Sequence, residues 1–136
     1  MSESDKRINL ARQWIEKAEH DLLNAEHTLK MGHDCPYDTV CFHAQQCAEK
    51  YLKGFLTFHS VEFPKTHDLR VLMQHASAIA PLALDMNALL TLNRYPIEAR
   101  YPGDWETITR EDAVEALAIA RKARAAIKAH LPEGME

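Results

Sequence analysis

Residues 42–56, FHAQQCAEKYLKGFL, sort apolar and polar side chains around one helix, and no other segment constrains the fold as strongly. An α-helix turns by about 100° per residue, so each position has a defined direction once His43 is set at zero. One half of the helix then carries Val40, Cys41, Ala44, Cys47, Ala48, Tyr51, Leu52, Gly54 and Phe55. We expect that half to face a hydrophobic core.

The other side of this helix gathers polar groups within an arc of about 80°. We call this set the polar strip, and its members are His43, Gln46, Lys50, Lys53 and Thr57. Two cations, an amide and an imidazole on one strip can receive an anion. Phe42 and Leu56 also lie outside the apolar half, so we expect them to be covered either by a partner protein or by residues 94–108.

Glycine and proline residues separate the apolar-periodic segments and so define the helix boundaries. The pattern predicts helices over residues 5–31, 36–60, 66–79, 81–95 and 109–130. We expect Gly32 to end the first helix, Pro36 to take the first position of the second, Thr66 to cap the third and Thr109 to begin the last. No strand pattern competes. The predicted fold class is all-α, with five helices joined mostly by short turns that favour antiparallel neighbours.

Length and composition are those of one globular domain over residues 1–136, with 46% hydrophobic and 26% charged residues. The net charge of −4 and a pI near 6.0 argue against sequence-blind nucleic-acid binding, which normally needs a basic face. The longest apolar runs are far shorter than the roughly 20 residues that cross a bilayer. The polar N-terminus has no signal-peptide core. We therefore expect a cytoplasmic protein without a membrane partner.

The three cysteines do not have the spacing of a zinc site, because no C-x2-C pair is present. Cys41 and Cys47 are predicted to be small core residues. Cys35 precedes the second helix beside His33, where it could be an exposed thiol.

Three motifs carry a resemblance to a known family. They are His43-Ala-Gln-Gln-Cys-Ala-Glu-Lys-Tyr-Leu-Lys53, Thr66-His-Asp-Leu69 and Ala99-Arg-Tyr-Pro102. The chain resembles HEPN domains, small helical proteins named for nucleotide binding in higher eukaryotes and prokaryotes. The resemblance implies an up-and-down four-helix bundle with an additional short helix, commonly a homodimer.

The resemblance also implies a ligand-binding set that extends the polar strip. Its members are His43, Gln46, Lys50, Lys53, His67, Asp68, Arg100, Tyr101 and Asp104. The lysines would act as point charges toward phosphate, Arg100 as a bidentate fork and Tyr101 as a stacking face. Two structural alternatives stay open. Lys53 can simply pair with Glu49 on a solvated helix face, and for His67 we favour a structural hydrogen bond over an acid–base role.

RNA-cleaving members of this superfamily carry an arginine followed after four to six residues by a histidine. Arg70 with His75 and Arg124 with His130 fit that spacing, but about one or two such matches arise by chance. Neither arginine is followed by the polar residue that is usual in the motif. The sequence also has no Glu-x-x-His or His-x3-His for a metal and no glycine-rich phosphate loop, so we expect no cofactor beyond a possible nucleotide ligand.

Three functions remain open. The leading hypothesis is a helical module that binds a nucleotide or a partner protein, paired with a minimal nucleotidyltransferase in a toxin–antitoxin-like module. That partner is implied by the resemblance, because family members of this size are often encoded beside such an enzyme. The alternatives are a metal-independent RNA-cleaving toxin that uses Arg100, His43 or His67, and a purely structural interaction bundle.

Overall fold

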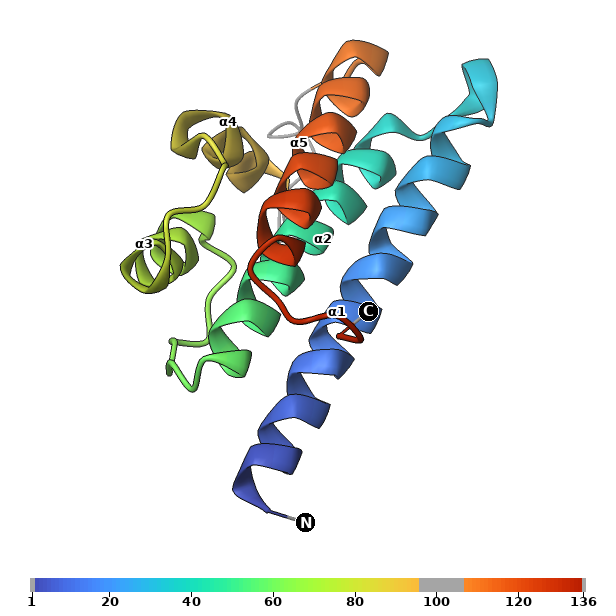
Figure 1. Ribbon diagram of the computed structural model, residues 1–136. Coiled ribbons are helices and arrows are strands. Elements are labelled where there is room, and N and C mark those ends of the chain that lie inside the picture. The colour runs from blue at the N-terminus through green and yellow to red at the C-terminus, as the bar shows by residue number, and fades with distance from the viewer. Residues whose placement is uncertain (1, 96–106, 136) are drawn as a thin grey trace.

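The computed structural model describes residues 2–95 and 107–135 (Figure 1). Within these ranges the chain forms five α-helices and two short 3₁₀ turns, with no strand. The elements are α1 (Glu3–Leu29), η1 (Gly32–Asp34), α2 (Tyr37–Phe58), α3 (Leu69–Ile79), α4 (Met86–Leu90), η2 (Thr91–Arg94) and α5 (Arg110–Lys128). The prediction of an all-α helical bundle with one additional short helix, α4, is confirmed.

Helix α2 lies at the centre of the bundle. It contacts α1, α3 and α5, and α1 also contacts α5. Figure 1 places α1 on one side and the short helices α3 and α4 on the other, with α2 and α5 between them. None of the helices in the described ranges is both long and apolar enough to span a membrane.

Local capping chemistry explains where the helices begin. Ser2 and Thr109 each form a complete capping box, and Gly32 follows α1 with a φ of +80°, a conformation that glycine adopts without strain. The predicted starts of α2 and α3 differ. Pro36 is the N-cap of α2 and not its first residue, and the carboxylate of Asp68 caps α3 by accepting from the Arg70 amide, in place of Thr66.

The fourth helix is much shorter than residues 81–95. It begins after Asp85, whose side chain accepts a hydrogen bond from the Ala88 amide. The end of the predicted helix forms the separate 3₁₀ turn η2. Pro81 fits the first turn of a helix because it has no N–H to satisfy, but it offers no group that accepts from the free amides there. The Asp85 carboxylate does accept from such an amide, so the helix begins after Asp85.

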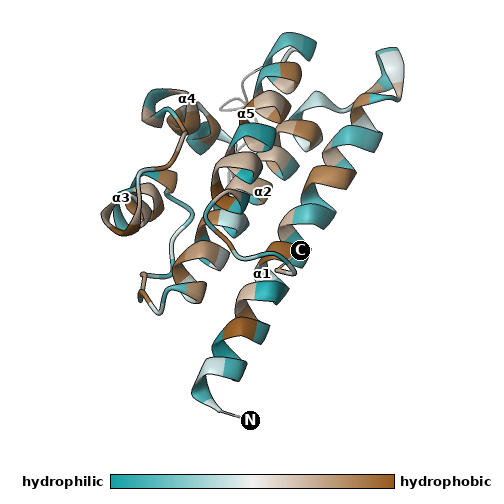
Figure 2. Cartoon of the chain, in the orientation of Figure 1, coloured by the Kyte–Doolittle hydropathy of each residue, from teal (hydrophilic) through white to brown (hydrophobic). Residues whose placement is uncertain are grey.

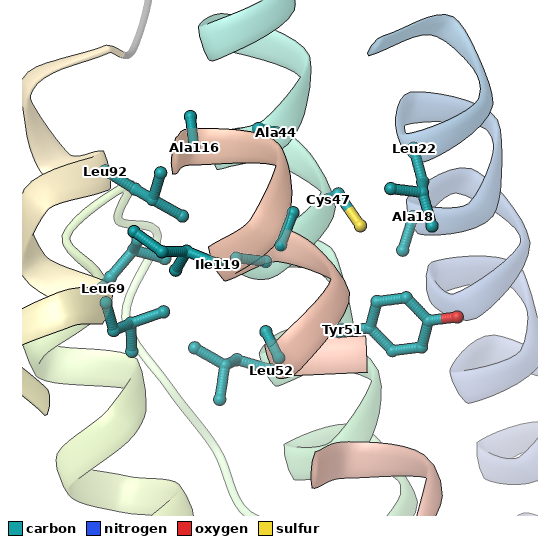
Figure 3. Packing of buried hydrophobic residues seen from close by; sticks show 14 of the residues in the cluster. Ala18, Leu22, Ala44, Cys47, Tyr51, Leu52, Leu69, Leu92, Ala116 and Ile119 are labelled. Atoms are coloured by element: carbon teal, nitrogen blue, oxygen red, sulfur yellow. The ribbon is translucent and has the colours of Figure 1, made fainter. Parts of the chain in front are cut away.

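The core is built around the apolar half of α2, and all nine residues predicted there are buried. Teal and brown bands alternate along α1 (Figure 2), as expected for a helix with one buried face. In Figure 3 the sulfur of Cys47 points toward Ala18 and Leu22 of α1, and the ring of Tyr51 also points toward α1. On the other side of α2, Leu69 of α3 and Leu92 of η2 meet Ile119 of α5.

Two predictions about the core are wrong. Leu56, expected outside the core face, is fully buried within the chain, and Cys35, expected as an exposed thiol, is 7% exposed; both belong to the hydrophobic core. Helix α2 is covered by other helices on more than one side, so its buried arc exceeds the half that a helix packed on one side would show. Phe42 is half-buried, and its ring meets the His43 ring edge-on at a centroid distance of 5.3 Å.

Candidate functional site

The lysines and the histidine of the polar strip on α2 pair with carboxylates of the same chain. Lys50 and His43 are bound by Asp21 of α1, and we call these three residues the Asp21 cluster. Lys53 is bound by Glu49 of α2, which also binds Gln45 and His67. Those four residues are the Glu49 cluster. The structure therefore places four members of the predicted ligand set, His43, Lys50, Lys53 and His67, in two groups, each centred on an acid.

In the Asp21 cluster, one carboxylate links α1 to two residues of α2. Its Oδ1 lies 2.8 Å from His43 Nδ1 and its Oδ2 lies 2.6 Å from Lys50 Nζ. The Asp21 side chain is only 10% exposed, while those of His43 and Lys50 are each 24% exposed. A charge this deeply buried needs a partner, so Asp21 and Lys50 stabilise each other as they join the two longest helices.

In the Glu49 cluster, a buried carboxylate accepts hydrogen bonds from three directions. Oε1 accepts from Gln45 Nε2 at 3.0 Å and lies 2.9 Å from His67 Nδ1, and Oε2 accepts from Lys53 Nζ at 3.0 Å. The Glu49–Lys53 ion pair expected from the i, i+4 spacing is present. It is not on a solvated face, because the side chains of Glu49 and Lys53 are only 3% and 9% exposed. Lys53 Nζ also lies 5.4 Å from the centroid of the Trp14 ring, a cation–π contact.

His67 is brought to this cluster by the segment between α2 and α3. Its side chain is 58% exposed although Nδ1 is held by Glu49. A carboxylate can only accept a hydrogen bond, so Nδ1 carries the proton and Nε2 of a neutral ring remains an acceptor. His43 is oriented in the same way by Asp21. Each cluster thus presents an imidazole that is positioned by an acid.

The other predicted site residues have local roles or lie outside the described ranges. Gln46 Nε2 donates to Gln45 Oε1 at 2.7 Å, next to the Glu49 cluster. Asp68 caps α3 and accepts from Asn93 Nδ2 at 3.0 Å. Arg100, Tyr101 and Asp104 lie outside the described residues.

Sequence reasoning did not assign Asp21, Gln45 or Glu49 to the site. One signal points to Asp21, since it interrupts the stripe of buried residues Ala18, Leu22 and Ala25 on α1. A carboxylate among apolar positions of a core-facing stripe is a candidate for an interhelical ion pair.

A third acidic centre joins three helices. Glu19 of α1 accepts hydrogen bonds from the Tyr51 hydroxyl of α2 and from Arg124 Nε of α5, the latter at 2.5 Å, and Lys128 Nζ lies 3.6 Å away. Burial raises the pKa of Glu19, but the hydrogen bonds from Tyr51 and Arg124 outweigh it and leave the pKa below its ordinary value. Burial and the bond to Glu19 also raise the pKa of Tyr51. Arg124 is thus engaged by Glu19, although its spacing to His130 fits the arginine–histidine motif.

Nucleophilic or metal chemistry has little support in the described ranges. They contain no group of three or more His, Cys, Asp or Glu side chains that could hold a metal ion. Burial raises the pKa of the Cys41 thiol to about 11, which disfavours the reactive thiolate. The chemistry that the clusters allow is hydrogen bonding and proton transfer by the oriented imidazoles.

Comparisons with known proteins agree with the helical architecture. The family model described as "HEPN domain" matches residues 11–130. A relative from Methanocaldococcus jannaschii, named "Putative toxin MJ1304", is 28% identical over 149 residues, which cover 98% of this chain and 95% of the relative. TT1696 from Thermus thermophilus superposes with a TM-score of 0.70 at 32% identity, over 89% of this chain and 98% of that one. ST0689, described as an archaeal HEPN homologue, gives a TM-score of 0.67 at 26% identity, over 88% and 96%.

Proposed function

Because this chain belongs to the HEPN domain family, we propose that it is a toxin-like module that acts by binding a protein partner, a minimal nucleotidyltransferase encoded beside it. The relative named as a putative toxin supports the toxin-like part, since it matches nearly the whole chain. A toxin has to be restrained in the cell that makes it, which implies a second protein. The nucleotidyltransferase is the partner that the family resemblance suggests.

One observation carries the choice of a protein partner over a nucleotide at the polar strip. Lys50 and Lys53 are both bound by carboxylates of the same chain, at 2.6 Å and 3.0 Å. A phosphate would have to displace Asp21 or Glu49, each of which would then remain buried without its lysine. The lysines therefore serve the fold better than they serve an anionic ligand. We expect the binding form to be a cytoplasmic homodimer.

Complex formation tests this proposal directly. The chain is mixed at micromolar concentration with the nucleotidyltransferase from the neighbouring gene, which is recognised by its Gly-Ser and paired-Asp signature. Light scattering behind a sizing column gives the mass of each protein alone and of the mixture. We expect a dimer for the chain alone and one complex peak for the mixture. Two separate peaks at these concentrations would refute the partner proposal.

A second candidate function is metal-independent RNA cleavage, and the two oriented imidazoles favour it. His43 and His67 each have Nδ1 held by a carboxylate, at 2.8 Å and 2.9 Å, which is how proteins position a histidine for proton transfer. His67 is the more accessible of the two. In this candidate Arg100 would stabilise the charge that develops on the phosphate.

Incubation with a mixed RNA panel in EDTA distinguishes this candidate. Cleavage by the wild type that is lost in His67→Ala, His43→Ala or Arg100→Ala would make the chain a ribonuclease. His33→Ala is the matched control, because His33 is exposed and pairs with its likewise exposed sequence neighbour Asp34. Intact RNA with the wild type, or cleavage that is unchanged in all three site variants, would eliminate this assignment.

A further inference from the structure

Three basic groups meet where the start of α1, the end of α2 and the end of α5 come together. We call Arg7, His59 and His130 the basic end cluster. The His59 ring lies 4.7 Å from the centroid of the Phe55 ring, and the His130 ring lies 6.4 Å from the same centroid. The Arg7 guanidinium lies 5.8 Å from the centroid of the Phe58 ring. Both imidazoles are exposed, so a solute can reach them.

The Arg7 side chain is fixed by one hydrogen bond, while another of its N–H donors has no acceptor among the described residues. Its Nη1 donates to Ser60 Oγ at 2.9 Å, while its buried Nε has no hydrogen-bond partner among the described residues. Buried donors without a partner are rare in native proteins and call for an explanation. Nε itself is enclosed by the protein, but the guanidinium carries further N–H donors that are suited to an oxyanion, which accepts from several donors at once.

The residue that anchors Arg7 is itself strained. Ser60 has a φ of +60°, in the left-handed region, and it ends α2 by a Schellman motif in which the Val61 amide donates to the Leu56 carbonyl at 2.9 Å. Glycine would take this position at lower cost. A serine here keeps the hydroxyl that receives Arg7, and strain of this kind concentrates at binding sites.

The cluster differs from the polar strip because no acid of the described residues neutralises it. No carboxylate there forms an ion pair with Arg7, His59 or His130, and Glu133 instead lines a small cavity with Ile15. Burial lowers the pKa of His59, and the charges that act on that pKa are Arg7 and His130, which lower it further. The site is therefore short of negative charge.

We propose that the basic end cluster binds a phosphate anion, either free or as a phosphate monoester, between the Arg7 guanidinium and the imidazoles of His59 and His130. This inference rests on its own contacts and does not depend on the proposed partner. An anion that accepts from the Arg7 guanidinium also offsets the repulsion among the three basic groups. Protonated imidazoles bind it more tightly than neutral ones, so the affinity rises as the pH falls through the pKa of His59.

Nuclear magnetic resonance of the histidine side chains tests the site in the full-length protein. Inorganic phosphate is titrated at about pH 6 with constant ionic strength. We expect the His59 and His130 signals to shift together along one saturable curve. Arg7→Gln should weaken binding by at least about fivefold, because it removes a charge-assisted hydrogen bond. Arg12→Gln, which changes an exposed arginine of the same helix, should bind as the wild type does.

A sulfate titration isolates the protein's own pH dependence, since sulfate keeps its charge where phosphate does not. We expect weaker binding at about pH 8 than at about pH 5.5. Adenosine monophosphate and adenosine are added as competitors of phosphate. If the site accepts phosphate monoesters, adenosine monophosphate should displace phosphate, and adenosine, which has no phosphate group, should not. Equal affinity of Arg7→Gln and Arg12→Gln, or histidine signals that phosphate leaves unmoved, would overturn the proposal. If Arg7→Gln does not fold by circular dichroism, His59→Gln and His130→Gln decide in its place.

Discussion

Replacing Glu49 by glutamine removes the charge at the centre of the Glu49 cluster while keeping the shape of the side chain. Lys53, whose side chain is 9% exposed, then stays buried beside a neutral amide. Breaking a buried ion pair by removing one partner costs about 3 to 5 kcal/mol. The Trp14 ring, 5.4 Å from Lys53 Nζ, still attracts the cation and offsets part of this cost. We therefore expect Glu49→Gln to lower the free energy of unfolding by about 3 kcal/mol, a large share of the roughly 5 to 15 kcal/mol of a typical domain.

Urea unfolding followed by circular dichroism measures this loss, because urea carries no charge and leaves ion pairs unscreened. Glu26→Gln is the matched control. Glu26 pairs with Arg121 at 2.6 Å, but the Arg121 side chain is 53% exposed, so its loss should cost at most about 1 kcal/mol. Lys53→Met alone and combined with Glu49→Gln completes a double-mutant cycle, in which a coupling energy above about 1 kcal/mol is expected. Equal costs for Glu49→Gln and Glu26→Gln, or a coupling near zero, would refute the reasoning.

Three further predictions concern packing, reactivity and pH. Gly54→Ala should lower the urea-unfolding free energy by about 1 to 2 kcal/mol despite the better helix propensity of alanine, because the new Cβ would lie 2.9 Å from Ile15 Cδ1 and 3.1 Å from Trp14 Cβ, which is fixed to the backbone of α1. An unchanged or higher urea midpoint would show that these neighbours of α1 shift at little cost. Burial raises the pKa of Cys41 to about 11, so a thiol reagent at about pH 8 should label it only after unfolding, and rapid labelling of the native protein would contradict this. The hydrogen bond from the Thr109 amide lowers the pKa of Asp112 in the folded state, so this carboxylate stabilises the protein above its unfolded pKa and loses the effect as the pH falls through the lower folded pKa. The difference in urea midpoint between wild type and Asp112→Asn should therefore shrink from about pH 6 to about pH 3. A difference that stays constant over this range would exclude the effect.

The candidate site was only partly predictable. The helical periodicity placed Lys50 and Lys53 on one strip of α2, and both side chains are bound by carboxylates of the chain. It could not show that Asp21 of α1 reaches Lys50, because that contact depends on how far and at what angle α1 packs against α2. It also left open a Glu49–Lys53 pair on a solvated face, whereas both side chains are buried and His67 from the segment before α3 contacts Glu49.

The sequence by itself determined the helical class, the approximate span of α1, α2, α3 and α5, and the apolar half of α2. These features depend on residues within a few positions of one another, through periodicity, capping and turn chemistry. Only the tertiary structure decided that Leu56 is buried, that the lysines of the strip are neutralised, and that Arg7, His59 and His130 meet without an acid. Such contacts join residues far apart in the chain. Their charge and burial follow from helix packing, which no local pattern specifies.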